Sequence, residues 1–356
     1  MQIPLTYKNS PLIGFDIGSQ TVKLVQLAKK GSKTKVVGYG FASFPTGIVL
    51  EGIISDPKAV GDAVKPILKQ LAIGKFTGKR VSASLPVAKT FVRTLDLPKM
   101  SKSDLNQAIE LQSEQYIPMA ASDLYMDYEV IDENIEADDK EPHLSVLLAA
   151  SPRAIVDSYV QLFDYLNFEV DSFEISMAAL ARAIKLTSST NQPILLVDFG
   201  YSSTGLTVFD KVLRFTGTVD IGSNNLTEKI GDALKMPLDS VNKLKVKFGI
   251  GPSAYQAKVL TAIAPTIDQL ISEITKAIKY YEDRKQEAKI TTVVFSGGGT
   301  NMPGLLDYIA KKTKWQVQGF DLWSKLQVKP LQLPVRAEKN IYDTAIGLAL
   351  KGVGYD

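Results

Sequence analysis

The sequence predicts an α/β protein built from two related halves. Two segments half a chain apart, Pro11–Gly18 and Pro193–Gly200, both run from apolar residues into Asp-x-Gly and then into hydroxyl residues. Their offset is constant, 193 − 11 = 182 at the proline and 198 − 16 = 182 at the aspartate. This is too long for a solenoid repeat, and strand-like alternation follows each motif. We therefore expect two facing half-molecules, each with an Asp-bearing turn at the seam.

The chemistry of these turns suits a nucleotide's phosphates. An apolar run that ends in Asp-x-Gly indicates a buried strand and a tight turn, whose N–H groups and hydroxyls can bind an anion. A carboxylate would repel that anion unless a cation lies between them, and Mg²⁺ bound to a polyphosphate meets this need. Asp16 and Asp198 are the predicted magnesium ligands. The alternative is two ordinary hairpins in which Asp and Gly only form turns.

A third element supports the nucleotide interpretation. The apolar run Thr291–Ser296 leads directly into Gly297-Gly298-Gly299-Thr300. Consecutive glycines after a buried strand allow a flat group to lie against the backbone, although a flexible loop is the alternative. The chain has no Gly-x-x-x-x-Gly-Lys-Ser/Thr and no Gly-x-Gly-x-x-Gly, which excludes a P-loop and disfavours a Rossmann site.

Composition excludes several other classes of protein. With 356 residues, 45% of them hydrophobic, the chain can bury two sizeable cores. A net charge of +3 without a Lys/Arg-rich run gives no nucleic-acid footprint, and the absence of Cys excludes thiolate metal sites. Apolar runs are too short to span a bilayer, and Met1–Ser10 lacks a signal-peptide core. We expect a cytoplasmic protein that reaches a membrane only through a partner.

The order of the two turns and the Gly-Gly-Gly loop resembles the ATPase fold of actin, Hsp70 and the sugar kinases. Phe173–Ala181 and Tyr342–Ala349 resemble its two connecting helices, and their small residues would let the helices cross closely. Within this fold, the start Pro11–Leu27 is most similar to the families of the cell-division protein FtsA and the type IV pilus assembly protein PilM. The resemblance implies an α/β, actin-like fold of two lobes with duplicated ribonuclease-H-like cores.

The resemblance also implies a domain organisation. Residues 1–85, 169–192 and 328–356 would form the first lobe, residues 86–168 an inserted α/β subdomain of the FtsA/PilM type, and residues 193–327 the second lobe. The pattern inside the insert predicts two helices on a small antiparallel sheet. Its elements are expected at Thr90–Leu95, Lys102–Tyr116, Tyr125–Ile131, Leu144–Ala149 and Pro152–Leu166.

Residue roles follow from the same resemblance. Glu174 occupies the position of the residue that orients the attacking water, so it is the candidate general base. Tyr201 and Ser202 replace glycines of the actively hydrolysing relatives, so we expect ATP binding with slow or negligible hydrolysis. Asn242 stands where a ribose-binding Glu is usual, and its amide can still accept a hydrogen bond. The expected nucleotide contacts are Gly18, Ser19, Gln20, Gly200, Tyr201, Ser202, Ser203, Gly222, Asn225, Asn242, Lys245, Gly297, Gly298, Gly299, Thr300 and Met302.

A PilM-like protein implies an adaptor under the type IV pilus machine. It would bind the cytoplasmic N-terminal peptide of PilN in a groove between the first lobe and the insert, near Val92–Leu97 and Leu105–Tyr116, and contact other platform and motor components. Self-association into rings and a peripheral place at the inner membrane go with this role. The alternative is an FtsA-like polymerising division protein, although the residues after Ala349 hold no membrane helix of the FtsA type. A small-molecule kinase and a type II secretion component are weaker alternatives.

Overall fold

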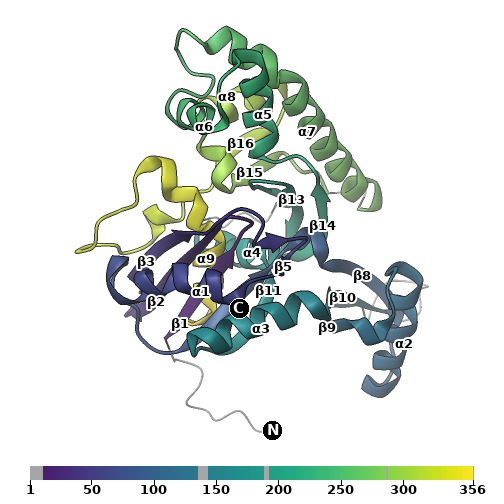
Figure 1. Cartoon of the computed structure of the whole chain (residues 1–356). Helices are drawn as coiled ribbons and strands as arrows, with labels where there is room; N and C mark the ends of the chain where they lie inside the picture. Colours follow the sequence, from purple (N-terminus) through teal and green to yellow (C-terminus); the bar gives the residue numbers. More distant parts are fainter. Residues whose placement is uncertain (1–10, 135–142, 188–191, 286–287, 356) are drawn as a thin grey trace.

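The computed structural model describes residues 11–134, 143–187, 192–285 and 288–355. They form two lobes and a smaller insert (Figure 1). The first lobe is built on a six-stranded sheet in the order β11-β7-β1-β2-β3-β6, and the second on a five-stranded sheet in the order β14-β13-β12-β15-β16. Strands of the first sheet are β1 Leu12–Ile17, β2 Thr21–Lys30, β3 Lys33–Ser43, β6 Ile73–Gly74, β7 Arg80–Leu85 and β11 Glu169–Ile175. Those of the second are β12 Ile194–Phe199, β13 Thr204–Asp210, β14 Val212–Val219, β15 Thr292–Ser296 and β16 Gln316–Gly319.

The two sheets share one topology. β1 pairs antiparallel with β2 and parallel with β7, and β12 pairs in the same way with β13 and β15. Equivalent residues also share a register, because Asp16 opposes Lys23 and Asp198 opposes Gly205, again 182 residues on (205 − 23 = 182). The duplicated core predicted from the repeat is therefore confirmed.

Two helices cross between the sheets. They are α4, Ser176–Thr187, and α9, Asp343–Lys351, and both contribute to a core that also contains residues of each sheet. A Cβ on Gly347 would overlap the carbonyl oxygen of Ala179, and a Cβ on Gly14 would overlap that of Ala345. The small residues predicted to allow close crossing therefore do so, and they bring β1 against α9.

Other helices cover the outer faces. In the second lobe these are α5 Ser223–Leu234, α6 Leu238–Lys247, α7 Gln256–Arg284 and α8 Leu305–Lys312. In the first lobe, α1 Pro57–Pro66 begins at the side-chain cap of Asp56, whose Oδ1 accepts the N–H of Ala59, and continues as a π turn over Ile67–Leu71. A short hairpin of β4, Val49–Leu50, and β5, Ile53–Ile54, precedes it.

The insert is a three-stranded antiparallel sheet in the order β8-β10-β9 with one helix on it. Its strands are β8 Phe91–Pro98, β9 Leu124–Asn134 and β10 His143–Pro152. The helix α2, Lys102–Tyr116, starts at Ser101, whose hydroxyl accepts the Asp104 N–H. Leu105 and Ile109 of α2 pack on Leu95 and Val146 of the sheet.

The expectation of a second helix on this small sheet is wrong. The helix concerned, α3, Arg153–Leu166, packs with α1 on the first lobe, where the Phe163 ring meets the Phe15 ring edge-on at 5.2 Å. Its apolar stripe includes Tyr159 and Leu162, which are fully buried in the same core. The reason is connectivity, because α3 returns the chain from β10 to β11 and can bury this stripe against the first sheet on the way.

Candidate functional site

The two predicted carboxylates meet where the lobes join. Asp16 and Asp198 each stand one residue before the end of equivalent central strands, β1 and β12. Burial first and the negative charge of Asp16 second raise the pKa of Asp198 from 3.8 to about 6, and the charge of Lys23 offsets part of this rise. Since each group feels the other's charge, the structure brings both aspartates and Lys23 together.

Lys23 is a site residue that the motif analysis missed. Its Nζ lies 3.1 Å from Asp16 Oδ2, and both side chains are more than four-fifths buried. The second oxygen of Asp16 accepts a hydrogen bond of 2.8 Å from Ser84 Oγ on β7. A signal for Lys23 was present in the sequence, because a residue that faces Asp16 across a tight hairpin must lie a few residues after Gly18 on the next strand.

The first turn keeps donors available. The N–H of Gly18 closes the turn onto the Thr21 carbonyl at 2.9 Å. The side chain of Gln20 reaches Thr46 Oγ1 at 3.4 Å. Within the described chain, the N–H groups of Ser19 and Gln20 make no backbone hydrogen bond, and both residues are partly exposed. Ser19 and Gln20 thus keep backbone N–H groups that can bind an anion, whereas the N–H of Gly18 is used by the turn.

The second turn is held from behind by helix α5. The carbonyls of Gly200 and Tyr201 accept the N–H groups of Ser223 and Asn224, both at 2.9 Å. A Cβ on Gly222 would overlap the Tyr201 carbonyl, so only glycine fits at that position. Two predicted contact residues, Gly222 and Asn225, therefore support the turn.

Asn225 does so by accepting the Gly222 N–H on Oδ1 at 2.7 Å. The side chains that remain free to face a ligand belong to the turn itself. They are the exposed Tyr201 and Ser202 and the partly buried Ser203.

The glycines after β15 have a packing role. Gly297 has φ +85°, and a Cβ there would lie 2.5 Å from Asp198 Oδ1. A Cβ on Gly299 would lie 2.5 Å from the ring of Phe199. Two of the three glycines thus let the end of β15 pack against β12, the strand of Asp198. A Cβ on Gly298 would instead lie 3.3 Å from Ile341 Cγ2.

The rest of that loop is tied internally. Thr300 Oγ1 donates to the Gly297 carbonyl at 2.6 Å and accepts from Asn340 Nδ2 at 2.8 Å. Met302 packs in the core of the second lobe, so a ligand can meet only its backbone. Met302 is the weakest of the predicted nucleotide contacts for this reason.

Lys245 and Asn242 meet on one hydroxyl beside the second turn. Lys245 Nζ donates to Thr227 Oγ1 at 2.7 Å and to the Ser223 carbonyl at 3.0 Å, and Asn242 Oδ1 accepts from Thr227 at 3.2 Å. Burial lowers the pKa of Lys245 from 10.5 to about 8. The pair thereby fixes α6 on α5 next to the predicted ligand.

Glu174 lies in the same sheet row as Asp16 and Ser84. Glu174 on β11 pairs with Ser84 on β7, and β7 lies between β11 and β1, the strand of Asp16. The Glu174 carboxylate bonds to Arg182 at 2.7 Å and to Lys351 at 3.5 Å, which links β11 to both crossing helices. Its role as a general base stays a prediction, and both of its carboxylate oxygens are held by these ion pairs.

A third buried acid was also missed by the sequence analysis. Asp343, at the start of α9, is fully buried and accepts a hydrogen bond of 2.8 Å from Ser296 Oγ. Burial raises the pKa of Asp343 well above its usual value, and the charge of Asp198 adds to the rise. Among the described residues its Oδ1 has no partner. Sequence reasoning had placed Asp343 only in a connecting helix.

The carboxylates of Asp16 and Asp198 fit a metal ion that is also bound by phosphates and water. Within the described part of the chain no three His, Cys, Asp or Glu side chains gather as a self-sufficient metal site. Two facing carboxylates, Asp16 and Asp198, are nevertheless the hard oxygen donors that Mg²⁺ uses together with phosphates and water. Magnesium carried by a nucleotide therefore fits these residues better than a free resident ion.

The chain matches a known protein family and a solved structure over nearly its whole length. A family model described as type IV pilus assembly protein PilM matches residues 14–353. The chain belongs to the PilM family. The solved structure of a PilM–PilN type IV pilus biogenesis complex superposes with a TM-score of 0.83 at 18% identity, covering 97% of this chain and 99% of that one. The actin-like fold predicted from the motifs is thus confirmed.

The chain is also similar to a cell-division protein and to a solved structure of an MreB protein. The cell division protein FtsA of Neisseria meningitidis serogroup B is 19% identical over 334 residues, covering 83% of this chain and 80% of FtsA. The crystal structure of MreB5 of Spiroplasma citri bound to ADP superposes with a TM-score of 0.50 at 10% identity, covering 97% of this chain and 95% of that one.

Proposed function

We propose that this PilM-family chain is a Mg-ATP-binding adaptor that carries a pilus membrane protein on its insert. The observation that carries the proposal is the meeting of Asp16, Asp198 and Lys23 at the junction of the two lobes. The nucleotide-bound actin-like structure of MreB5 supports a nucleotide at this junction.

Each residue at the junction has a defined task in this proposal. Asp16 and Asp198 hold the magnesium through its water shell, and Lys23 exchanges its bond with Asp16 for a phosphate oxygen. The free N–H groups of Ser19 and Gln20 bind phosphate from the first lobe, while Ser202 and Ser203 do so from the second. Bound magnesium supplies charge neutralisation between the carboxylates and the phosphates.

Hydrolysis is slow in this proposal. A general base must reach the proton that it abstracts. The carboxylate of Glu174 is instead held by Arg182 and Lys351, which would keep it from an attacking water. In this proposal bound ATP therefore fixes the angle between the two lobes, and its hydrolysis contributes little to function.

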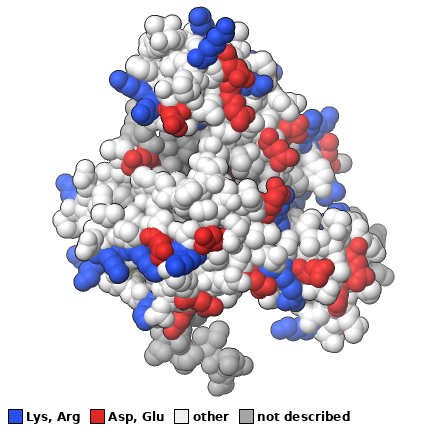
Figure 2. Space-filling model, in the orientation of Figure 1, with Lys and Arg blue, Asp and Glu red and all other residues white. Residues whose placement is uncertain are grey.

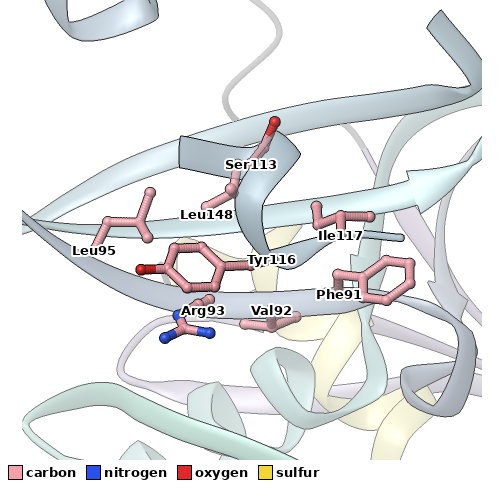
Figure 3. A pocket seen from close by; sticks show the side chains of 8 residues that line it. All are labelled: Phe91, Val92, Arg93, Leu95, Ser113, Tyr116, Ile117 and Leu148. Atoms are coloured by element: carbon pink, nitrogen blue, oxygen red, sulfur yellow. The ribbon is translucent and has the colours of Figure 1, made fainter. Parts of the chain in front are cut away.

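In this proposal the partner groove is a hollow of about 140 Å³ between β8 and the end of α2 (Figure 3). These are the two elements named in the sequence analysis, but all of the residues that line the hollow belong to the insert and none to the first lobe. The likeness to a PilM–PilN complex supports a PilN-type cytoplasmic segment as the occupant. Its lining consists of Phe91, Val92, Arg93, Leu95, Ser113, Tyr116, Ile117 and Leu148.

The insert also touches the second lobe, which offers a route for coupling. Thr94 Oγ1 donates to the Arg214 carbonyl on β14 at 3.0 Å, and β8 runs beside β14 in Figure 1. β14 is the hairpin partner of β13, which begins directly after the Asp198 turn. A ligand that fixes the lobe angle thus acts on the strand that lines the groove.

Membrane association in this proposal comes through the partner. In the part of the chain that the structure describes, every helix is too short or too polar to cross a bilayer. A cytoplasmic, peripheral place at the inner membrane follows from binding the tail of a membrane protein.

Calorimetry with the N-terminal cytoplasmic peptide of the organism's own PilN-type protein tests the proposal. We expect saturable one-to-one binding by the Mg-ATP-loaded protein, lost in Tyr116→Ala. Tyr280→Ala is the matched control, because both tyrosines are a little over two-fifths exposed and each has an arginine over its ring. No binding by folded, nucleotide-loaded protein would contradict the adaptor role and favour a polymerising, FtsA-like one.

A further inference from the structure

The insert differs from the rest of the chain in its charge. Between Phe91 and Pro152 the sequence has 13 Asp or Glu and 4 Lys or Arg, a net charge of −9 (4 − 13). Since the whole chain carries +3, the remainder carries +12 (3 + 9). Figure 2 shows acidic side chains gathered over the insert. An insert this acidic on a basic body makes a local field of one sign beside the groove.

Two of these carboxylates lie beside the groove. Glu110 and Glu114 are on α2 within one turn of Ser113, a residue of the groove lining. Both are exposed. In the described structure neither makes an ion pair or a side-chain hydrogen bond. Their charges are therefore available to an approaching partner.

The groove floor has the opposite character. Its lining is mainly apolar, and its one cation, Arg93, lies over the Tyr116 ring at 3.6 Å (Figure 3). A lysine or arginine of a partner would meet Arg93 if it entered the hollow. Cations are favoured only outside it, near Glu110 and Glu114. The guanidinium itself offers N–H donors to backbone carbonyls of a bound segment.

We propose that the groove selects a segment of one chemical class, a short apolar stretch flanked by lysine or arginine. This inference rests on the proposed function, since it names the chemistry of the segment that docks there. The apolar residues fill the hollow, and the flanking cations pair with the carboxylates of α2. Cytoplasmic segments beside a membrane helix are rich in Lys and Arg. A tail of that composition therefore matches the acidic insert, whereas an acidic segment is repelled.

Salt-dependent binding kinetics test this inference. The probes are the PilN-type N-terminal peptide and a version in which each Lys and Arg is replaced by Gln. We expect the affinity of the unaltered peptide to fall on the order of tenfold between 50 and 500 mM salt, mainly through the association rate. The neutralised peptide should bind more weakly at low salt and show little salt dependence.

A charge-neutralised protein supplies the second arm. The double variant Glu110→Gln, Glu114→Gln should reduce the salt dependence. The control Asp232→Asn, Asp239→Asn removes the same charge from exposed sites of the second lobe and should leave the salt dependence unchanged.

The possible failures are distinct. Binding that is equally tight for both peptides and insensitive to salt would overturn this inference while the peptide groove stands. Failure of both peptides to bind at any salt concentration would overturn the groove and the inference together.

Discussion

Asp16 and Lys23 face each other across the first hairpin, with Nζ and Oδ2 3.1 Å apart at the junction of the lobes. The ion pair with Asp16 fixes the position of the Lys23 ammonium group at the predicted phosphate site. In the proposed Mg-ATP complex, Asp16 would hold the magnesium and the Lys23 ammonium would be left to pair with a phosphate oxygen.

Replacing Lys23 should weaken nucleotide binding. Lys23→Met removes a phosphate partner, and we expect an affinity for Mg-ATP at least tenfold lower, about 1.4 kcal/mol. Lys29→Met on the same strand is the control, because Lys29 is exposed. Calorimetry with Mg-ATP measures both. Unchanged affinity in Lys23→Met would mean that the phosphates do not bind at this turn.

Removing the metal or its ligand should have the same outcome. Asp16→Ala and chelation of Mg²⁺ by EDTA are each expected to weaken ATP binding, and chelation should have little further effect on Asp16→Ala. This follows because Asp16 acts through the cation. Additive losses would separate Asp16 from the metal.

Protein stability should depend on the protonation of Asp198. Its pKa is higher in the folded protein, about 6, than the ordinary 3.8, so the folded state binds the proton more tightly. The free energy of unfolding therefore falls as pH rises from about 4 to 6, because the folded protein must then bury an ionised Asp198. Above pH 6 this loss of stability is complete. Asp198→Asn removes this cost, and we expect the nucleotide-free variant to be more stable than wild type at pH 7.5 by on the order of 1–3 kcal/mol.

Denaturant unfolding at pH 4.5 and 7.5 checks this prediction. The gain should shrink at pH 4.5, where wild-type Asp198 is protonated, and Mg-ATP binding should be lost at either pH. A gain of equal size at both pH values would assign the effect to something other than the charge.

The crossing of α4 and α9 should tolerate no side chain at Gly347. A Cβ there would overlap the Ala179 carbonyl, so Gly347→Ala must push the two helices apart. We expect a loss of about 2–4 kcal/mol in thermal or denaturant unfolding. Gly319→Ala is the control, because its Cβ would only touch Leu306 at 3.4 Å. Equal stability of the two variants would contradict the close crossing.

Contact between the insert and the second lobe should couple the two ligands. We expect peptide affinity to differ about fivefold or more between Mg-ATP-loaded and nucleotide-free protein. Thr94→Val removes the bond to the Arg214 carbonyl and should reduce this ratio. Ser145→Ala, which removes a bond of 2.7 Å to Asp96 within the insert, should not. A ratio of one in wild type would exclude the coupling and leave peptide binding intact.

The fold was largely accessible from the sequence because its strongest signals are local or repeated. The start of α2 at Ser101 follows from a hydroxyl cap, and the two central strands follow from apolar runs that end in Asp-x-Gly. The packing of α3 was not accessible in this way. Its apolar stripe specifies a helix with one buried face but not which sheet covers that face.

The site was accessible in part for a related reason. The Asp-x-Gly turns identify themselves by residue type, whereas Lys23 acquires its role only from the register of the hairpin. Asp343 depends on the meeting of α9 with Ser296, 47 residues away in sequence. Gly297 and Gly299 are required by the close approach of Asp198 and Phe199, which only the packing reveals.

Asp198 pairs with Gly205, where the first half pairs Asp16 with Lys23, and this difference removes the two-fold symmetry of the repeat at the predicted phosphate site. A Cβ on Gly205 would lie 2.8 Å from Met177 Sδ on α4, so a side chain there would require Met177 to move. Two equivalent turns with the same side chains would accept a phosphate chain in either direction. In the proposed complex, a lysine at only one of the two equivalent positions would give the site a polarity, so the nucleotide would enter in one sense and its base would lie on a fixed side of the molecule.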